Sequence, residues 1–95
     1  MNNKLIFIVD DEPAICRLMR ILLEDTGYDI KEFHNGAELM EELLHSALPE
    51  LVLLDIMLPG EDGLSLLKRL RGNKRYAQLP VIMLTAKGSE ADKVK

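Results

Sequence analysis

Residues 51–60 read Leu-Val-Leu-Leu-Asp-Ile-Met-Leu-Pro-Gly, and this segment indicates the architecture more strongly than any other. Four consecutive apolar residues without polar alternation predict a strand that is buried on both faces, as in a parallel sheet. The Pro-Gly pair behind them predicts a turn. Asp55 is therefore expected at the carboxyl end of a buried strand, the edge at which open α/β sheets bind ligands. An ionised carboxylate beside an apolar core is costly, so Asp55 is expected to have a partner.

Three further strands and three helices are predicted from the spacing of apolar residues. Continuous apolar runs at residues 5–9 and 81–84 predict buried strands, and the partly alternating residues 28–33 predict an edge strand. The expected apolar helix faces are Ile15, Leu18, Met19 and Leu22, then Leu39, Met40, Leu43 and Leu44, then Leu64, Leu67 and Leu70. Alternating strands and helices predict an α/β fold, a doubly wound parallel sheet of strand order 2-1-3-4 with helices on both faces.

Each predicted helix carries a residue that favours its start. Pro13 suits a first helical turn, where its missing N–H is not needed. Asn35 with Glu38 has the spacing of a capping box, and Asp62 is the expected cap of the third helix. The spacing of residues 89–92 predicts that another helix begins there.

Length and composition place limits on the class of protein. The 95 residues allow one domain at most, residues 1–95, and the net charge of −4 argues against contact with nucleic acid or an anionic membrane. One cysteine, Cys16, cannot form an internal disulfide. Because the first apolar run is short and soon followed by acids, no signal peptide or membrane span is predicted. A cytoplasmic protein is expected.

Polar groups follow three of the four predicted strands. Asp10 and Asp11 follow the first strand, Asp55 ends the third, and Thr85 follows the fourth. In a 2-1-3-4 sheet the first and third strands are neighbours, so the three carboxylates are expected to converge at the switch point between them. Converging carboxylates repel one another, and a hard cation removes that repulsion. Mg²⁺ is the expected ion, because it prefers oxygen ligands and is commonly held by one or two carboxylates plus a phosphate.

Soft or borderline metals are not expected. Cys16 lies inside the first helix, where it is predicted to be a small core residue, and His34 and His45 are predicted to be exposed without a second ligand at metal spacing. None of the three is assigned to a strand end.

A carboxylate, a magnesium ion and a nearby hydroxyl suggest phosphoryl transfer to Asp55. Carboxylates accept phosphoryl groups as aspartyl phosphates, and the metal would neutralise charge on the phosphoryl oxygens during transfer. Thr85 would then be placed to donate a hydrogen bond to the new phosphoryl group. The chain has no G-x-x-x-x-G-K-[ST] loop, so the phosphoryl group is expected from a donor rather than from bound ATP.

These segments resemble the receiver domain of bacterial two-component response regulators. The resemblance rests on residues 9–12 (Val-Asp-Asp-Glu), 55–63 (Asp-Ile-Met-Leu-Pro-Gly-Glu-Asp-Gly) and 84–87 (Leu-Thr-Ala-Lys). In this order and at these strand ends the motifs are highly specific, and the likeness covers all 95 residues. It implies a flavodoxin-like signalling domain that is phosphorylated by a sensor histidine kinase or phosphotransfer protein and controls an output domain or target protein.

The resemblance also implies a role for each site residue. Asp55 matches the phosphoacceptor, Asp11 the direct magnesium ligand and Asp10 the acid that holds the ion through water. Met57 matches the residue whose backbone carbonyl binds the metal, and Thr85 the switch hydroxyl. The implied activity is at most self-catalysed phosphotransfer and slow autodephosphorylation, so a conventional enzyme is not expected.

One departure from the family pattern concerns the carboxyl-terminal part. Receivers have a fifth strand that ends in a lysine and carries an aromatic switch residue, then a fifth helix, and these 95 residues include neither. Lys87 does not replace that lysine, because it follows the fourth strand two residues after Thr85. We therefore expect a C-terminally incomplete receiver from a longer regulator. Its fourth strand would lack an outer neighbour, so the chain is expected either to dimerise through that edge or to remain loosely packed.

Three other classes of protein share part of this pattern. A haloacid-dehalogenase-type phosphatase needs a second Asp two positions after its nucleophile, where this chain has Met57. A flavodoxin-type flavin binder needs a first loop that accepts phosphate, which residues 10–12 would repel. A non-catalytic receiver-like interaction module stays open, because the family lysine is missing from these residues.

Overall fold

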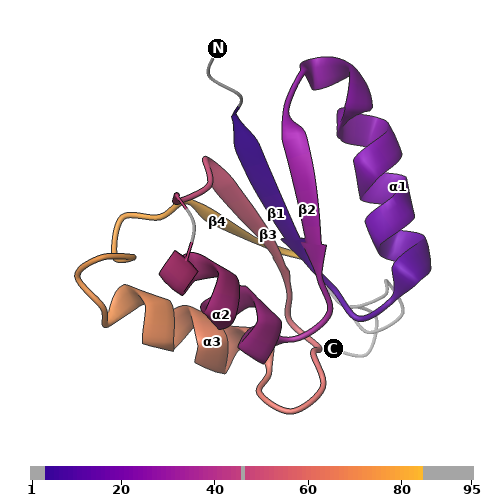
Figure 1. Cartoon of the computed structure of the whole chain (residues 1–95). Helices are drawn as coiled ribbons and strands as arrows, with labels where there is room; N and C mark the ends of the chain where they lie inside the picture. Colours follow the sequence, from indigo (N-terminus) through magenta and orange to yellow (C-terminus); the bar gives the residue numbers. More distant parts are fainter. Residues whose placement is uncertain (1–3, 46, 85–95) are drawn as a thin grey trace.

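The structure, a computed structural model, describes residues 4–45 and 47–84 and contains four strands and three α-helices (Figure 1). In chain order the elements are β1 (Leu5–Val9), α1 (Pro13–Leu23), the 3₁₀ turn η1 (Glu24–Thr26), β2 (Asp29–Phe33), α2 (Gly36–His45), β3 (Leu51–Asp55), α3 (Gly63–Arg71) and β4 (Val81–Leu84). The helix expected at residues 89–92 lies outside the described residues.

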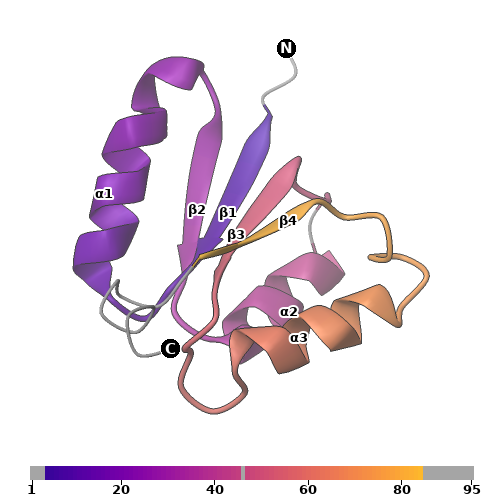
Figure 2. The same cartoon turned by 180° about the vertical axis from the view of Figure 1, so that it is seen from behind.

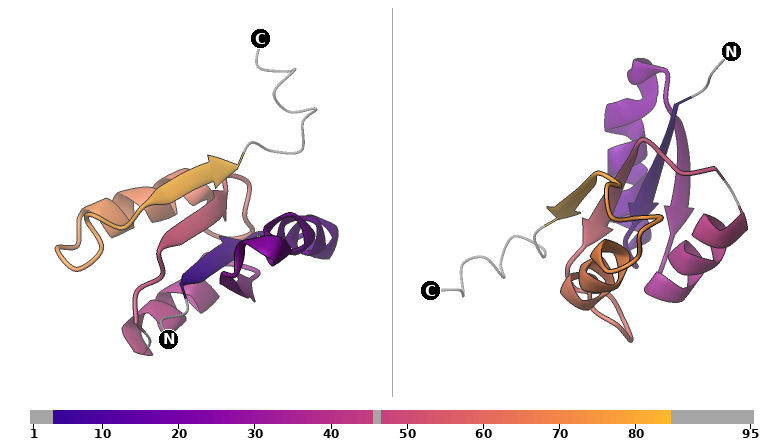
Figure 3. Two further views of the ribbon diagram at one scale, coloured as in Figure 1. Left: turned by 90° about the horizontal axis from the view of Figure 1, so that it is seen from above. Right: turned by 90° about the vertical axis from the view of Figure 1, so that its left-hand side faces the viewer.

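The strands form one parallel sheet in the order β2-β1-β3-β4, which confirms the predicted α/β architecture. Helix α1 covers one face, and α2 and α3 cover the other, as Figure 2 and the view from above in Figure 3 show. Residues 29–33 form an edge strand with alternating exposure, as predicted.

Each face of the sheet has its own apolar core, because side chains alternate along the strands. The larger core joins Phe7, Val9, Val52 and Leu54 of the central strands to α2 and α3. The smaller core joins Ile6, Ile8 and Leu53 to Cys16 of α1. Cys16 has no exposed surface, so its predicted place in the core is confirmed.

The predicted helix faces were partly wrong, because each helix contacts the sheet along a narrower line than its apolar residues suggest. Leu18, Leu22, Leu44 and Leu64 are all exposed, between 49% and 66%. Leu39, Leu43 and Leu70 are buried as predicted, whereas the other buried side chains, Cys16 in α1 and Leu66 in α3, were not assigned to the predicted faces. Apolar spacing located the helices correctly, but it did not fix their rotation about the helix axis.

The three predicted helix starts that fall within the described residues are confirmed. Pro13 is the first residue of α1. The Asn35 side chain accepts a bond from the Glu38 amide (2.8 Å), and the Glu38 carboxylate reaches back to the His34 amide (2.9 Å). Asp62 accepts a bond from the Ser65 amide (2.8 Å) at the start of α3. These side chains satisfy amide groups that have no partner within a helix.

Gly63 packs the start of α3 against the end of β3. A Cβ atom at this position would overlap the carbonyl oxygen of Asp55 and lie 2.8 Å from the Cα of Ile56. The Gly63 amide also donates to the Ile56 carbonyl (2.7 Å). The missing side chain thus allows helix and strand to meet where Asp55 is held.

We predict that Gly63→Ala lowers the free energy of unfolding by about 2 kcal/mol or more, since overpacking against backbone costs roughly 1–3 kcal/mol. Gly72→Ala is the matched control, because a Cβ there would meet nothing closer than 3.5 Å. Urea unfolding followed by circular dichroism measures both. Equal stabilities of the two variants would contradict the packing argument.

The outer edge of β4 is unpaired within the described part of the chain, and Ile82 on it is 52% exposed. An apolar open edge is a template for pairing with another chain. We predict that the 95-residue chain does not behave as a rigid monomer: it either dimerises at this edge or stays loosely packed. Light scattering after size exclusion, together with a thermal melt, measures this.

Ile82→Lys should weaken any association at this edge, because an edge lysine opposes strand pairing. Leu22→Lys is the control, because it charges an apolar side chain that is 63% exposed on α1. A concentration-independent wild-type monomer with a sharp two-state melt would show that four strands suffice.

Candidate functional site

The candidate site lies where β1 and β3 end side by side. Val9 pairs with Leu54 in the sheet register, so the next residue of each strand, Asp10 and Asp55, falls at the same level of the same edge. Asp11 follows Asp10 directly. One carboxylate oxygen from each of the three residues lies within 4.8 Å of the others. The predicted convergence of these carboxylates is therefore confirmed as geometry.

The three carboxylates differ in exposure. Asp10 and Asp55 are only 3% and 1% exposed, whereas Asp11 is exposed at the rim. The backbone amide of Glu12 donates to Asp10 Oδ1 (2.9 Å), and the amide of Met57 donates to Asp55 Oδ1 (3.1 Å). Each buried carboxylate is thus held by the amide two residues ahead, as in an Asx turn. A ligand can approach the cluster from the Asp11 side.

This donor set suits a hard divalent cation. Three carboxylates at this separation repel one another, and burial of two of them strengthens the repulsion. An oxygen-only site with one open, exposed side matches Mg²⁺, which keeps several water ligands. Asp10, Asp11 and Asp55 could together hold such an ion.

Of the two remaining residues of the predicted site, the structure describes Met57 and not Thr85. Met57 follows Asp55 by two residues in the loop to α3, and its amide is the donor to Asp55. Its side chain is 51% exposed, which fits a role for its backbone rather than its side chain. Thr85 lies outside the described residues.

A second group of potential ligands was missed at the sequence level. Cys16 of α1, Glu32 of β2 and His34 each offer a donor atom, and these atoms lie within 4.8 Å of one another. The expectation that no histidine lies at a strand end was wrong, because His34 directly follows Phe33, the last residue of β2. Sequence spacing did not reveal the cluster because its members come from a helix and a strand that meet only after folding. Both histidines are exposed, as predicted.

The Cys16 thiol lies close to the acidic site as well. Its Sγ donates to the Asp10 carbonyl oxygen (3.5 Å). Burial, together with the nearby carboxylates of Glu32 and Asp10, raises the pKa of the Cys16 thiol to about 11. Because the thiolate is the reactive form, burial and these charges disfavour reaction of this cysteine at neutral pH.

Helices able to cross a membrane are not found among residues 4–45 and 47–84.

Comparison with known proteins agrees with this geometry. Residues 6–95 match the response regulator receiver domain family. The DNA-binding dual master transcriptional regulator RpaA of Synechocystis sp. is 43% identical over 90 residues, which are 95% of this chain and 37% of that protein. The chain therefore spans well under half the length of this curated relative.

Solved structures show the same fold at lower identity. The phosphorylated cyanobacterial phytochrome response regulator RcpA is 28% identical with a TM-score of 0.82, and the match covers 96% of this chain and 71% of that one. The Mn²⁺-bound form of response regulator Rcp1 is 29% identical with a TM-score of 0.82, with the same coverage of 96% and 71%. The chain belongs to the response regulator receiver domains of two-component signalling systems, with the flavodoxin-like fold of that family.

Proposed function

We propose that this chain is a phosphoacceptor domain that takes a phosphoryl group onto Asp55 with the help of Mg²⁺. The observation that carries the proposal is the meeting of three carboxylates, two of them buried, at the carboxyl ends of β1 and β3. Family membership supports it, as do a phosphorylated and a Mn²⁺-bound regulator of the same fold.

Each site residue then has a distinct role. Bound Mg²⁺ would neutralise charge on the phosphoryl oxygens during in-line transfer. Asp11 would bind the ion directly, Asp10 would hold it through water, and Met57 would offer its backbone carbonyl. The Thr85 hydroxyl would donate to the phosphoryl group and so transmit its presence to the rest of the domain.

The proposed reaction is a transfer between two protein side chains. An Asp55 carboxylate oxygen forms a bond to phosphorus, while the phosphorus–nitrogen bond of a phosphohistidine breaks and its electron pair returns to the imidazole. The Met57 amide, bonded to Oδ1 of Asp55, orients the carboxylate for attack. Later attack of water on phosphorus would restore the carboxylate and release phosphate. This is signalling chemistry rather than the work of a conventional enzyme.

The proposal also covers the partners of the domain and its location in the cell. The donor would be a sensor histidine kinase or phosphotransfer protein, and the readout an output domain or target protein outside this segment. Residues 1–95 would be the incomplete receiver part of a longer regulator. The relative RpaA is named as DNA-binding, and a regulator of that kind works where the chromosome lies, which supports a cytoplasmic location.

A non-catalytic interaction module is the second candidate. It has the same fold and the same cluster of Asp10, Asp11 and Asp55 as the phosphoacceptor, and it differs in chemistry alone. Such a module would keep the fold and would not take up a phosphoryl group.

We predict that Mg²⁺ binds with a dissociation constant of about 1 mM or tighter, roughly −4 kcal/mol. Asp11→Ala should weaken binding more than any other single substitution, because it removes the exposed direct ligand. Asp25→Ala is the matched control, since Asp25 is an exposed acid in η1 outside the cluster. Mg²⁺ titration followed by amide NMR shifts measures all three proteins. Equal affinities for wild type and Asp11→Ala would exclude Asp11 as the direct ligand.

With Mg²⁺ and a small acyl-phosphate donor, we predict that phosphoryl label appears on Asp55. For the 95-residue chain used in this experiment the yield should be low and the label short-lived, because the tested residues do not include the fifth strand and its lysine. The label should survive acid and be lost in alkali, and intact-protein mass spectrometry measures it.

Asp55→Asn should abolish the label. Asp62→Asn should keep it, because Asn also caps the α3 helix at this exposed position. Label that persists in Asp55→Asn would rule out this nucleophile, and wild type without label that still binds Mg²⁺ would favour the non-catalytic module.

A further inference from the structure

A cluster of three different donor types lies on the α1 side of the sheet, next to the acidic site but with none of its residues. Cys16 Sγ, a Glu32 carboxylate oxygen and a His34 ring nitrogen are mutually within 4.8 Å. They come from α1, from β2 and from the residue after β2, so the fold rather than the local sequence assembles them. None of the three has a part in the proposed phosphoryl transfer.

The chemistry of this donor set differs from that of the acidic cluster. Thiolate, imidazole and carboxylate are the ligands of zinc sites, whereas Mg²⁺ selects oxygen alone. Donor atoms on one tetrahedral Zn²⁺ lie about 3.3–3.6 Å apart, as the metal–ligand bond lengths imply. The three donor atoms now lie within 4.8 Å of one another, and rotation of the Glu32 and His34 side chains would bring them to that separation.

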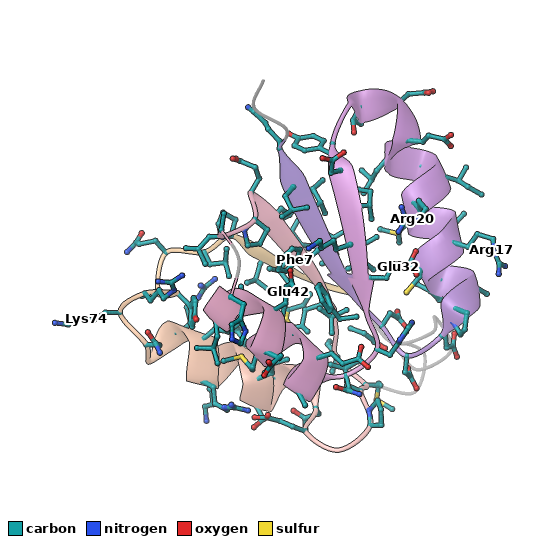
Figure 4. The ribbon with its side chains drawn as sticks, viewed as in Figure 1. Phe7, Arg17, Arg20, Glu32, Glu42 and Lys74 are labelled. Carbon is teal, nitrogen blue, oxygen red and sulfur yellow. The ribbon has the colours of Figure 1, made fainter. Side chains whose placement is uncertain are left out.

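A neighbouring charged side chain already orients one of the three ligands, Glu32, and a second ligand, His34, lies near another charged side chain. Arg20 Nε donates to Oε2 of Glu32 (2.8 Å), which leaves the other carboxylate oxygen for a metal. Figure 4 shows these two side chains directed toward one another in the space between α1 and β2. Oε1 of Glu38 lies 3.7 Å from His34 Nδ1. A bond between them would leave Nε2 as the ligand atom, the carboxylate–histidine–metal arrangement common in zinc proteins.

The different exposures of the three side chains indicate how an ion would reach the site. Cys16 has no exposed surface, whereas the side chains of Glu32 and His34 are 28% and 51% exposed. An ion would enter from solvent between the carboxylate and the imidazole and meet the thiol at the inner end. The thiol proton would pass to solvent as the sulfur–metal bond forms.

We propose that Cys16, Glu32 and His34 form a second metal site that takes Zn²⁺, with water as the fourth ligand. Three protein ligands with one open position is a common form of zinc coordination. An ion here would link α1 to the end of β2, and α1 is the only described helix on that face of the sheet. Occupancy would therefore stabilise the folded chain by mass action.

The test is equilibrium dialysis of the 95-residue chain against Zn²⁺ in excess Mg²⁺, so that the acidic cluster is occupied. Cys16→Ser and His34→Gln should each weaken Zn²⁺ binding by roughly 100-fold or more, since even loss of a residue that supports a ligand costs 10–100-fold. His45→Gln is the matched control: His45 is exposed, and its Nδ1 lies 3.5 Å from Glu41 one turn earlier in the helix. It should bind Zn²⁺ like wild type.

Two further measurements, one spectroscopic and one thermal, test the same site. Co²⁺ in place of Zn²⁺ should give a sulfur-to-cobalt charge-transfer band in the near ultraviolet, because Cys16 is the only cysteine in the chain. Zn²⁺ should also raise the melting temperature of wild type and of Asp55→Asn equally, which separates this site from phosphoryl transfer.

Three results would overturn the proposal. The first is the absence of the charge-transfer band from Co²⁺-loaded wild type. The second is Zn²⁺ binding that is lost in Asp11→Ala but kept in Cys16→Ser, which would place the ion in the acidic cluster. The third is equal loss in His34→Gln and His45→Gln, which would indicate adventitious binding to surface histidines.

Discussion

Two carboxylates buried side by side, those of Asp10 and Asp55, are the constraint on which the rest of the structure depends. Both follow apolar strands that must lie in the middle of the sheet, and the pairing of Val9 with Leu54 brings their ends to one level. Neither charge can move to solvent without pulling apolar residues out of the core. The repulsion between them favours a cation at this edge of the sheet.

The surrounding backbone is arranged around these two groups. The backbone amides of Glu12 and Met57 donate hydrogen bonds to the buried carboxylates, so the loops after β1 and β3 leave the sheet in defined directions. Gly63 lets α3 begin against the backbone of β3. The carboxylates are held before any ligand arrives, and the exposed Asp11 leaves one side of the cluster open. A site of this kind needs little reorganisation when an ion binds.

The two faces of the sheet are unequal, and this affects what each can do. Helices α2 and α3 cover one face of the sheet and enclose the larger core. In the part of the chain that the structure describes, α1 is the only helix on the other face, over the smaller core. Leu18 and Leu22 of α1 remain exposed, as does Ile82 of β4. The thinner face is also where Cys16, Glu32 and His34 meet. Fewer apolar contacts hold α1 in place, so a polar or metal-mediated link between α1 and β2 would matter more there than under α2 and α3.

Local sequence patterns were enough for the strands, the helices, their order and the acidic cluster. Apolar runs at residues 5–9 and 51–54 end in acids, and parallel strands bring those ends together by rule. The rotation of the helices followed from contacts with the sheet, so Leu64 is exposed where Leu66 is buried. The meeting of Cys16 with Glu32 and His34 also appeared only in the folded chain, because a helix face and a strand end share no sequence spacing. The periodicity of apolar residues predicts which side chains avoid water. The meeting of side chains from different elements depends instead on how whole helices and strands pack.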